Sequence, residues 1–150
     1  MRDKLFITVA IDSPAAAGAG TQSKLIAKHY NLYHLDTGKI YRYIGLIRLR
    51  FKSKFSYSFV RKKIQTLKIK SLLSKQLLTD EVAISAAIIA RDKKIRDIVH
   101  KFQQKCAYNP PKKFSGSVLD GRDITSIQVK NAMFKFYITA SIRARALRRY

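Results

Sequence analysis

The stretch IDSPAAAGAGTQSK, residues 11–24, decides the fold of this chain. The apolar run LFITVAI, residues 5–11, precedes the loop and ends at Asp12, as a strand buried on both faces does. From residue 20 onward, apolar residues recur at the spacing of an amphipathic helix. The order of strand, small-residue loop and helix is half of a βαβ unit.

The small residues of this loop suit phosphate binding, because they let successive backbone N–H groups point inward in front of a helix N-terminus. Against the pattern G-x-x-x-x-G-K-[ST], Ser13 replaces the first glycine and Gly18 matches the second. Ala19 replaces the lysine, and Thr21 places the hydroxyl group one position late. Taken alone, the segment leaves phosphate binding and an ordinary Ala/Gly loop equally open.

Three further segments have the composition of strands. Residues 32–35 end at Asp36, residues 117–119 end at Asp120, and residues 134–140 alternate between apolar and polar side chains. Because strands and helical patterns alternate, the sequence predicts an α/β fold with a parallel sheet flanked by helices. Ligands of such folds bind beyond the carboxyl ends of the strands, where Asp12, Asp36 and Asp120 all lie.

Helix signals are clearest in the middle of the chain. Thr79 is a good N-cap for DEVAISAAIIA, whose two acidic residues fall in the first turn. A helix over residues 93–105 ends before NPPKK. Residues 52–78 are strongly basic and mostly helical in period, and the sequence does not place their boundaries.

Composition limits the class of protein. With 150 residues and 47% hydrophobic content, we expect one domain with its own core. No apolar run approaches the roughly 18 residues that a membrane helix needs, and the single cysteine excludes an internal disulfide, so we expect a soluble, cytoplasmic protein. The net charge of +22 favours anionic partners, either polyanions or nucleotides, although the basic residues are spread along the whole chain.

Five segments in a fixed order carry a family resemblance: IDSPAAAGAGT, YHLDTGKIYR, TDEVAISAA, VLDGRD and FYITASIRARALRR. They resemble the bacterial cytidylate kinase family, P-loop nucleoside monophosphate kinases that transfer the γ-phosphoryl group of ATP to CMP or dCMP with Mg²⁺. The resemblance implies the fold of these kinases and small-molecule nucleotides as partners, with no membrane and no nucleic acid. It covers nearly all of the chain.

The resemblance also implies roles for particular residues. The residues expected at ATP are Ser13, Pro14, Ala15, Ala16, Ala17, Gly18, Ala19, Gly20, Thr21 and Arg149. The residues expected at the acceptor nucleotide are Asp36, Thr37, Arg42, Arg122 and Asp123. Catalysis would rest on Arg42, Arg122 and Arg145, and Thr21 would lie beside the Mg²⁺ that ATP carries.

The chain also departs from the family. Ala19 removes the lysine that bridges the ATP phosphates, for which Lys24 or Lys39 could substitute. Ser13 would be strained if its position needs the positive φ that glycine adopts freely. Ala87 stands where the family offers a serine to the base, which leaves the choice of base open.

The expected organisation is a single, incomplete P-loop kinase domain over residues 1–150, lacking the lid and C-terminal elements. Residues 43–79 would form a shortened nucleotide-covering insertion. The protein would be monomeric or dependent on a missing C-terminal segment, and the sequence does not decide whether the chain end is natural.

Two alternatives to an active CMP or dCMP kinase remain. One is a truncated, catalytically impaired remnant that still binds nucleotides, since the sequence does not decide whether catalysis survives Ala19. The other is a basic RNA-binding protein, which is disfavoured because no aromatic platform interleaved with the basic residues is identifiable.

Overall fold

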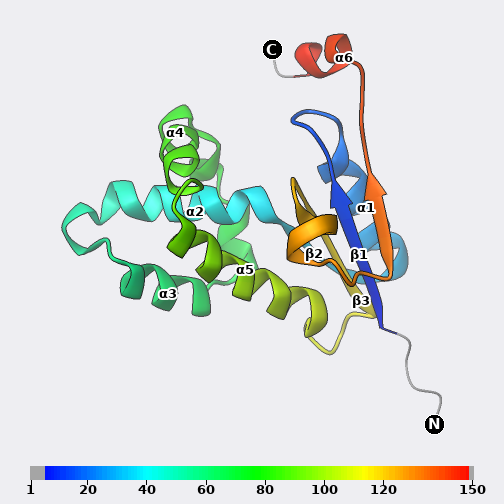
Figure 1. Ribbon diagram of the computed structural model, residues 1–150, viewed down its shortest axis with the longest axis horizontal. Helices are drawn as coiled ribbons and strands as arrows, with labels where there is room; N and C mark the ends of the chain where they lie inside the picture. Colours follow the sequence, from blue (N-terminus) through cyan, green and yellow to red (C-terminus); the bar gives the residue numbers. More distant parts are fainter. Residues whose placement is uncertain (1–5, 149–150) are drawn as a thin grey trace. The chain divides into compact units, whose positions relative to one another are not determined.

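Figure 1 shows the computed structural model, which describes residues 6–148. The chain forms two compact units: residues up to Asp36 together with those from Gln103 onward form unit 1, and residues 37–102 form unit 2. The strands are β1 (Ile7–Asp12), β2 (Leu32–Asp36), β3 (Gly116–Gly121) and β4 (Phe134–Tyr137). The helices are α1 (Ala19–Tyr30), α2 (Thr37–Arg50), α3 (Tyr57–Gln65), α4 (Asp80–Ile89), α5 (Lys93–Tyr108) and α6 (Ile142–Leu147). Shorter helical turns are η1 (Lys52–Lys54), η2 (Ile69–Leu73), η3 (Lys75–Leu78) and the π-helical η4 (Ile124–Gln128).

Unit 1 is built on a parallel sheet with the strand order β2-β3-β1-β4. The inner strand β1 pairs with β3 through Val9 and Val118 and with β4 through Val9 and Phe134. Ala10 and Ile11 are fully buried, as expected of a strand covered on both faces. The predicted parallel α/β sheet is therefore confirmed, with all four predicted segments in place.

Helix α1 packs on this sheet through small residues. Ala19, Ser23 and Ala27 are its buried positions, and the two alanines join a core cluster with Val9, Leu32 and other residues of the strands. Small side chains at these positions let the helix backbone lie close to the strands. The residue that replaces the expected lysine, Ala19, is thus part of the core.

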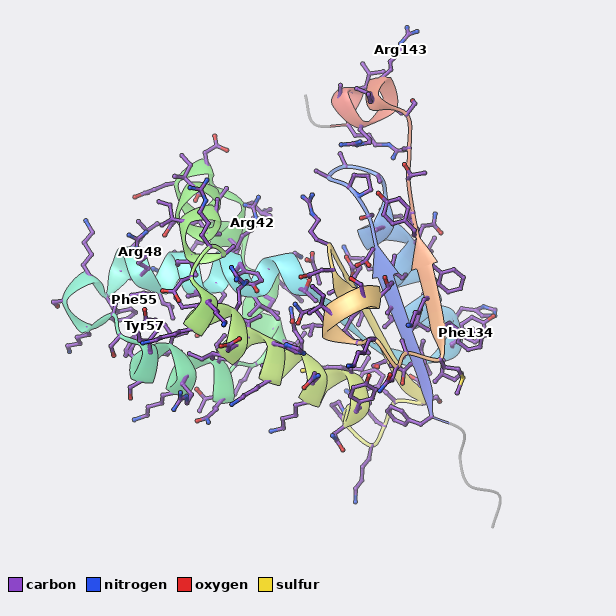
Figure 2. The ribbon with its side chains drawn as sticks, viewed as in Figure 1. Arg42, Arg48, Phe55, Tyr57, Phe134 and Arg143 are labelled. Atoms are coloured by element: carbon purple, nitrogen blue, oxygen red, sulfur yellow. The ribbon has the colours of Figure 1, made fainter. Side chains whose placement is uncertain are left out.

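The outer strand β4 is exposed along its whole length. Its aromatic residues include Phe134 and Tyr137, and Tyr137 is 70% exposed. Figure 2 shows Phe134 projecting from the outer side of this strand. Within the part of the chain that the structure describes, β4 is thus an edge strand.

Unit 2 is helical, and its core joins α2 to α4. Gly45 of α2 lies so close to α4 that a Cβ atom there would be 2.9 Å from the backbone nitrogen of Ala86. The Ser85 hydroxyl donates a hydrogen bond of 3.2 Å to the Gly45 carbonyl oxygen, which fixes the same contact. Glycine is needed at this position because any side chain would meet backbone atoms.

The predicted helix boundaries in the middle of the chain are largely confirmed. The Thr79 hydroxyl accepts a hydrogen bond from the backbone N–H of Val82, so it caps α4 as expected. Helix α5 begins at Lys93 as predicted and extends to Tyr108. The basic segment that the sequence left unplaced forms η1, α3, η2 and η3. No helix among residues 6–148 is long and apolar enough to span a membrane.

We expect Gly45→Ala to lower the free energy of unfolding by about 1–3 kcal/mol, because the added methyl group forces α2 and α4 apart. Gly38→Ala, at an exposed position in the first turn of the same helix, is the matched control. It should leave stability unchanged or raise it by up to about 1 kcal/mol. Urea unfolding followed by circular dichroism measures both values, and equal effects would contradict the close contact at Gly45.

Cys106 of α5 is buried, and burial raises the pKa of its thiol to about 11. Folding therefore favours the neutral thiol, and this stabilisation is complete below the pKa of a free thiol, about 8.5. It should be lost as the pH rises toward 11. We expect wild-type stability to fall over this range by about 2–3 kcal/mol more than that of Cys106→Ala, as measured by urea unfolding at each pH. Parallel curves would contradict a buried neutral thiol.

Candidate functional site

The loop between β1 and α1, Ser13–Gly18, is the centre of the candidate site in unit 1. Its first N–H, on Ser13, donates to the Gly121 carbonyl oxygen at the end of β3 (3.1 Å). Its last residue, Gly18, is the N-cap of α1 with φ of 99°, and its carbonyl oxygen accepts from the N–H groups of Thr21 and Gln22. The first turn of α1 carries no acidic residue. The positive end of the helix dipole therefore faces the loop, as an anion site requires.

The backbone strain of this loop lies at Ala16. Ala16 has φ of 59°, in the left-handed region that residues with a side chain seldom adopt, whereas Ser13 does not have a positive φ. The condition under which Ser13 would be strained is therefore not met. The position of the loop that favours glycine is Ala16.

Arg145 of α6 and Arg148, the residue that follows this helix, bind carbonyl oxygens of the loop. Arg145 Nε donates to the Ala15 carbonyl oxygen (2.9 Å), and the Arg148 guanidinium donates to the Ala16 carbonyl oxygen (3.1 Å). Figure 1 shows α6 following β4 along an extended segment. The structure therefore brings the predicted Arg145 to the predicted loop and adds Arg148, which sequence reasoning missed. The predicted Arg149 lies outside the described residues.

A groove of about 690 Å³ opens beside Gly18. The loop and α1 line one side, including Thr21 and Gln22, and β4 with the residues after it lines the other. Thr21 is exposed, so its hydroxyl group is accessible to a ligand. Within residues 6–148, Arg148 is the only charged residue in the lining.

Two buried carboxylates lie at the strand ends behind the loop. Asp12 accepts hydrogen bonds from the backbone N–H groups of Ile124 (2.6 Å) and Thr125 (3.1 Å), and so ties β1 to η4. Asp120 Oδ1 contacts His34 Nε2 at 2.6 Å, and its Oδ2 lies 3.8 Å from where a Cβ on Gly20 would stand. The strand-end rule pointed to both aspartates, but only the structure gives their partners.

The other predicted residues of unit 1 follow β2 and β3. Arg122 is exposed directly after β3, and Asp123 contacts the Gln128 side-chain nitrogen at 3.4 Å. Asp36 ends β2 and is half-buried. Three of the acceptor-site candidates thus lie at carboxyl ends of strands, as predicted.

The remaining candidates, Thr37 and Arg42, belong to α2 in unit 2. Thr37 is buried in the first turn of that helix. Arg42, labelled in Figure 2, donates from its guanidinium to the Leu77 carbonyl oxygen at 2.8 Å, which holds the side chain against η3. One bond still leaves most of the five N–H donors of a guanidinium for a ligand.

No group of three or more His, Cys, Asp or Glu residues that could hold a metal ion occurs in the part of the chain described here. Near the loop, the carboxylates of Asp12 and Asp120 are bound to protein groups. Mg²⁺ usually keeps several waters and binds through few protein oxygens together with substrate phosphates. The exposed Thr21 hydroxyl fits that pattern as one such oxygen.

Comparison with known proteins agrees with this geometry. The family described as cytidylate kinase matches residues 9–150. A cytidylate kinase of Bartonella tribocorum is 39% identical over 149 residues, and one of Bartonella quintana is 40% identical over 147 residues. Both alignments include 95% of this chain and 65% of the relative, so the chain spans about two thirds of the length of the curated relatives it matches.

We expect Ala16→Gly to stabilise the protein or leave it unchanged, within about 1 kcal/mol, because glycine relieves the positive φ while adding freedom to the unfolded chain. Ser13→Gly is the matched control in the same loop and should destabilise by about 0.5–1 kcal/mol, because no strain is relieved there. Thermal unfolding measures both. A larger loss for Ala16→Gly than for Ser13→Gly would contradict the strained conformation at Ala16.

Proposed function

Because the chain belongs to the cytidylate kinase family, we propose that it is a nucleoside monophosphate kinase that transfers the γ-phosphoryl group of ATP to CMP or dCMP. The products are ADP and CDP or dCDP. The observation that carries the proposal is the loop of residues 13–18, which joins a buried strand to a helix N-terminus that has no side-chain cap, beside an open groove. Such a loop suits the phosphates of ATP.

Phosphoryl transfer requires little covalent chemistry from the protein, so catalysis rests mostly on positioning the reactants and neutralising their charge. The ATP phosphates would lie along the loop and the N-terminus of α1, with Arg145 beside them. An oxygen of the acceptor phosphate attacks the γ-phosphorus, and the bond to the β-phosphate oxygen breaks. Mg²⁺, when bound with ATP, would neutralise charge on the phosphates, with Thr21 beside it.

The acceptor nucleotide would be held by the residues that the family resemblance assigns to it. Arg42 and Arg122 can each grip a phosphate bidentately, and this geometry is the reason arginine suits such sites. Asp36, Thr37 and Asp123 would orient the acceptor by hydrogen bonds. The exposed Ala87 of α4 offers no hydrogen-bonding group, so the discrimination between bases is left to other residues.

Ala19 favours one alternative: a nucleotide-binding protein with impaired catalysis. Removing one preorganised charge-stabilising donor costs about 10²–10³ in rate. This alternative predicts that CMP or ATP raises the melting temperature while turnover stays at background. Dependence on a further C-terminal segment predicts the same result until that segment is supplied.

The basic RNA-binding alternative has weaker support. Between Asp36 and Asp80 the sequence has no acidic residue, which makes the surface of unit 2 attractive to polyanions. Two of the aromatic rings there are in contact with lysines, however, since Lys63 lies over Phe51 and Lys94 lies over Tyr57. Tyr57, labelled in Figure 2, also donates to Asp92. Small-molecule nucleotides in the cytoplasm remain the proposed partners.

We expect a coupled ADP-release assay with CMP, ATP and Mg²⁺ to show turnover that depends on both nucleotides. Arg42→Ala should raise the KM for CMP about 10–100-fold, because a hydrogen bond to a charged group contributes about 1.5–3 kcal/mol. Arg48→Ala, on the same helix and also labelled in Figure 2, is the control and should change the KM for CMP less than about twofold.

Two results would contradict the proposal. One is turnover at background even when the C-terminal third of a relative is supplied in trans, together with no binding of CMP. The other is equal effects of Arg42→Ala and Arg48→Ala, which would place neither arginine at the acceptor.

A further inference from the structure

The missing lysine leaves the loop without a cation of its own. Residue 19 is an alanine buried in the core cluster under α1, so no side-chain charge reaches the loop from that position. The N–H groups of the loop and the helix dipole supply only partial charges. A triphosphate carries several full charges, so a full positive charge near Gly18 would add much to its binding.

Arg148 places a full charge at this point. A nitrogen of its guanidinium lies 3.1 Å from the Ala16 carbonyl oxygen and 3.5 Å from where a Cβ on Gly18 would stand. It therefore lies over the last turn of the loop, where the groove opens. With one hydrogen bond to the loop among the described residues, the guanidinium keeps four of its five N–H donors for a ligand.

We infer that Arg148 supplies the positive charge that Ala19 cannot, by binding the polyphosphate of a nucleoside triphosphate in the groove beside Gly18. This inference rests on the proposed kinase function and names the residue that compensates for the altered loop. The hydrogen bond to Ala16 holds the arginine at the phosphate position before the ligand arrives. A phosphate would then be gripped between the guanidinium and the N-terminus of α1.

Other cations are less well placed. Arg145 is half-buried, donates to Ala15 and lies outside the groove lining, so it is less well placed than Arg148 to bind a phosphate in this groove. Lys24 is exposed on α1 outside the lining. Lys39 belongs to unit 2 and already has an interaction partner.

The test is equilibrium binding by calorimetry, with the full chain and three probes: ATP, inorganic tripolyphosphate and CMP. We expect Arg148→Ala to lower the affinity for ATP and for tripolyphosphate about 10–100-fold, and to change the affinity for CMP less than about twofold. Arg148→Lys should retain part of the affinity. Arg143→Ala is the matched control, since Arg143 is exposed on the same helix and points away from the loop in Figure 2. It should change the affinity for every probe less than about twofold.

The melting temperature without ligand distinguishes a ligand-binding role of Arg148 from a purely structural one. Arg148 is exposed, so Arg148→Ala should shift that temperature by no more than about 2 °C. Unchanged affinity for ATP and tripolyphosphate in Arg148→Ala overturns the inference, as does equal weakening in Arg143→Ala. The inference is also overturned if Arg148→Ala lowers the melting temperature by more than this and weakens the affinity for CMP as much as the affinity for ATP.

The outcomes for the inference and for the proposed function are distinguishable. If wild type binds tripolyphosphate through Arg148 but neither binds CMP nor turns over, the inference stands and the kinase proposal fails. If wild type turns over and Arg148→Ala binds ATP normally, only the inference fails. If wild type binds neither ATP nor tripolyphosphate, both fail.

Discussion

The pairing of β1 between β3 and β4 is the constraint on which the rest of unit 1 depends. Because β1 is buried and hydrogen-bonded on both sides, its carboxyl end has a fixed position, and the chain has six residues in which to reach α1. The bond from Ser13 to Gly121 fixes the start of the loop, and Gly18 fixes its end. The anion-binding geometry is thus a consequence of strand burial and a short connection, and it needs only small residues.

The buried acidic groups behind this loop have hydrogen-bond partners within the protein. The carboxylate of Asp12 accepts backbone N–H groups of η4, and Asp120 contacts His34. Hydrogen bonds of this kind compensate a buried carboxylate for lost water. The positive potential of the helix N-terminus and of the arginines therefore remains available at the mouth of the groove.

The sequence predicted those features that depend on local order and failed on those that depend on tertiary contact. The four strands and the Thr79 cap follow from periodicity and from side chains adjacent in the chain. The sequence did not show that the positive φ lies at Ala16, because a pattern match does not show how the loop is bent. Arg148 reaches Ala16 across 132 residues, and no spacing rule links such distant positions. The π-helical η4 likewise depends on Asp12, more than 100 residues away.

An arginine on α6 differs physically from a lysine in the loop, because its position depends on a short helix. Six residues are too few for a helix to be stable by itself, so α6 relies on its Ser141 cap and on the two arginine bonds to the loop. Coupling between two binding events is reciprocal. A polyanion that contacts Arg148 in the docked position stabilises the docking of α6. Any contact that pulls α6 away therefore lowers the affinity for the polyanion by the same factor. A lysine at residue 19 would have no such dependence. Because residue 19 is alanine and not lysine, phosphate binding would depend on how the segment that follows β4 docks on the loop.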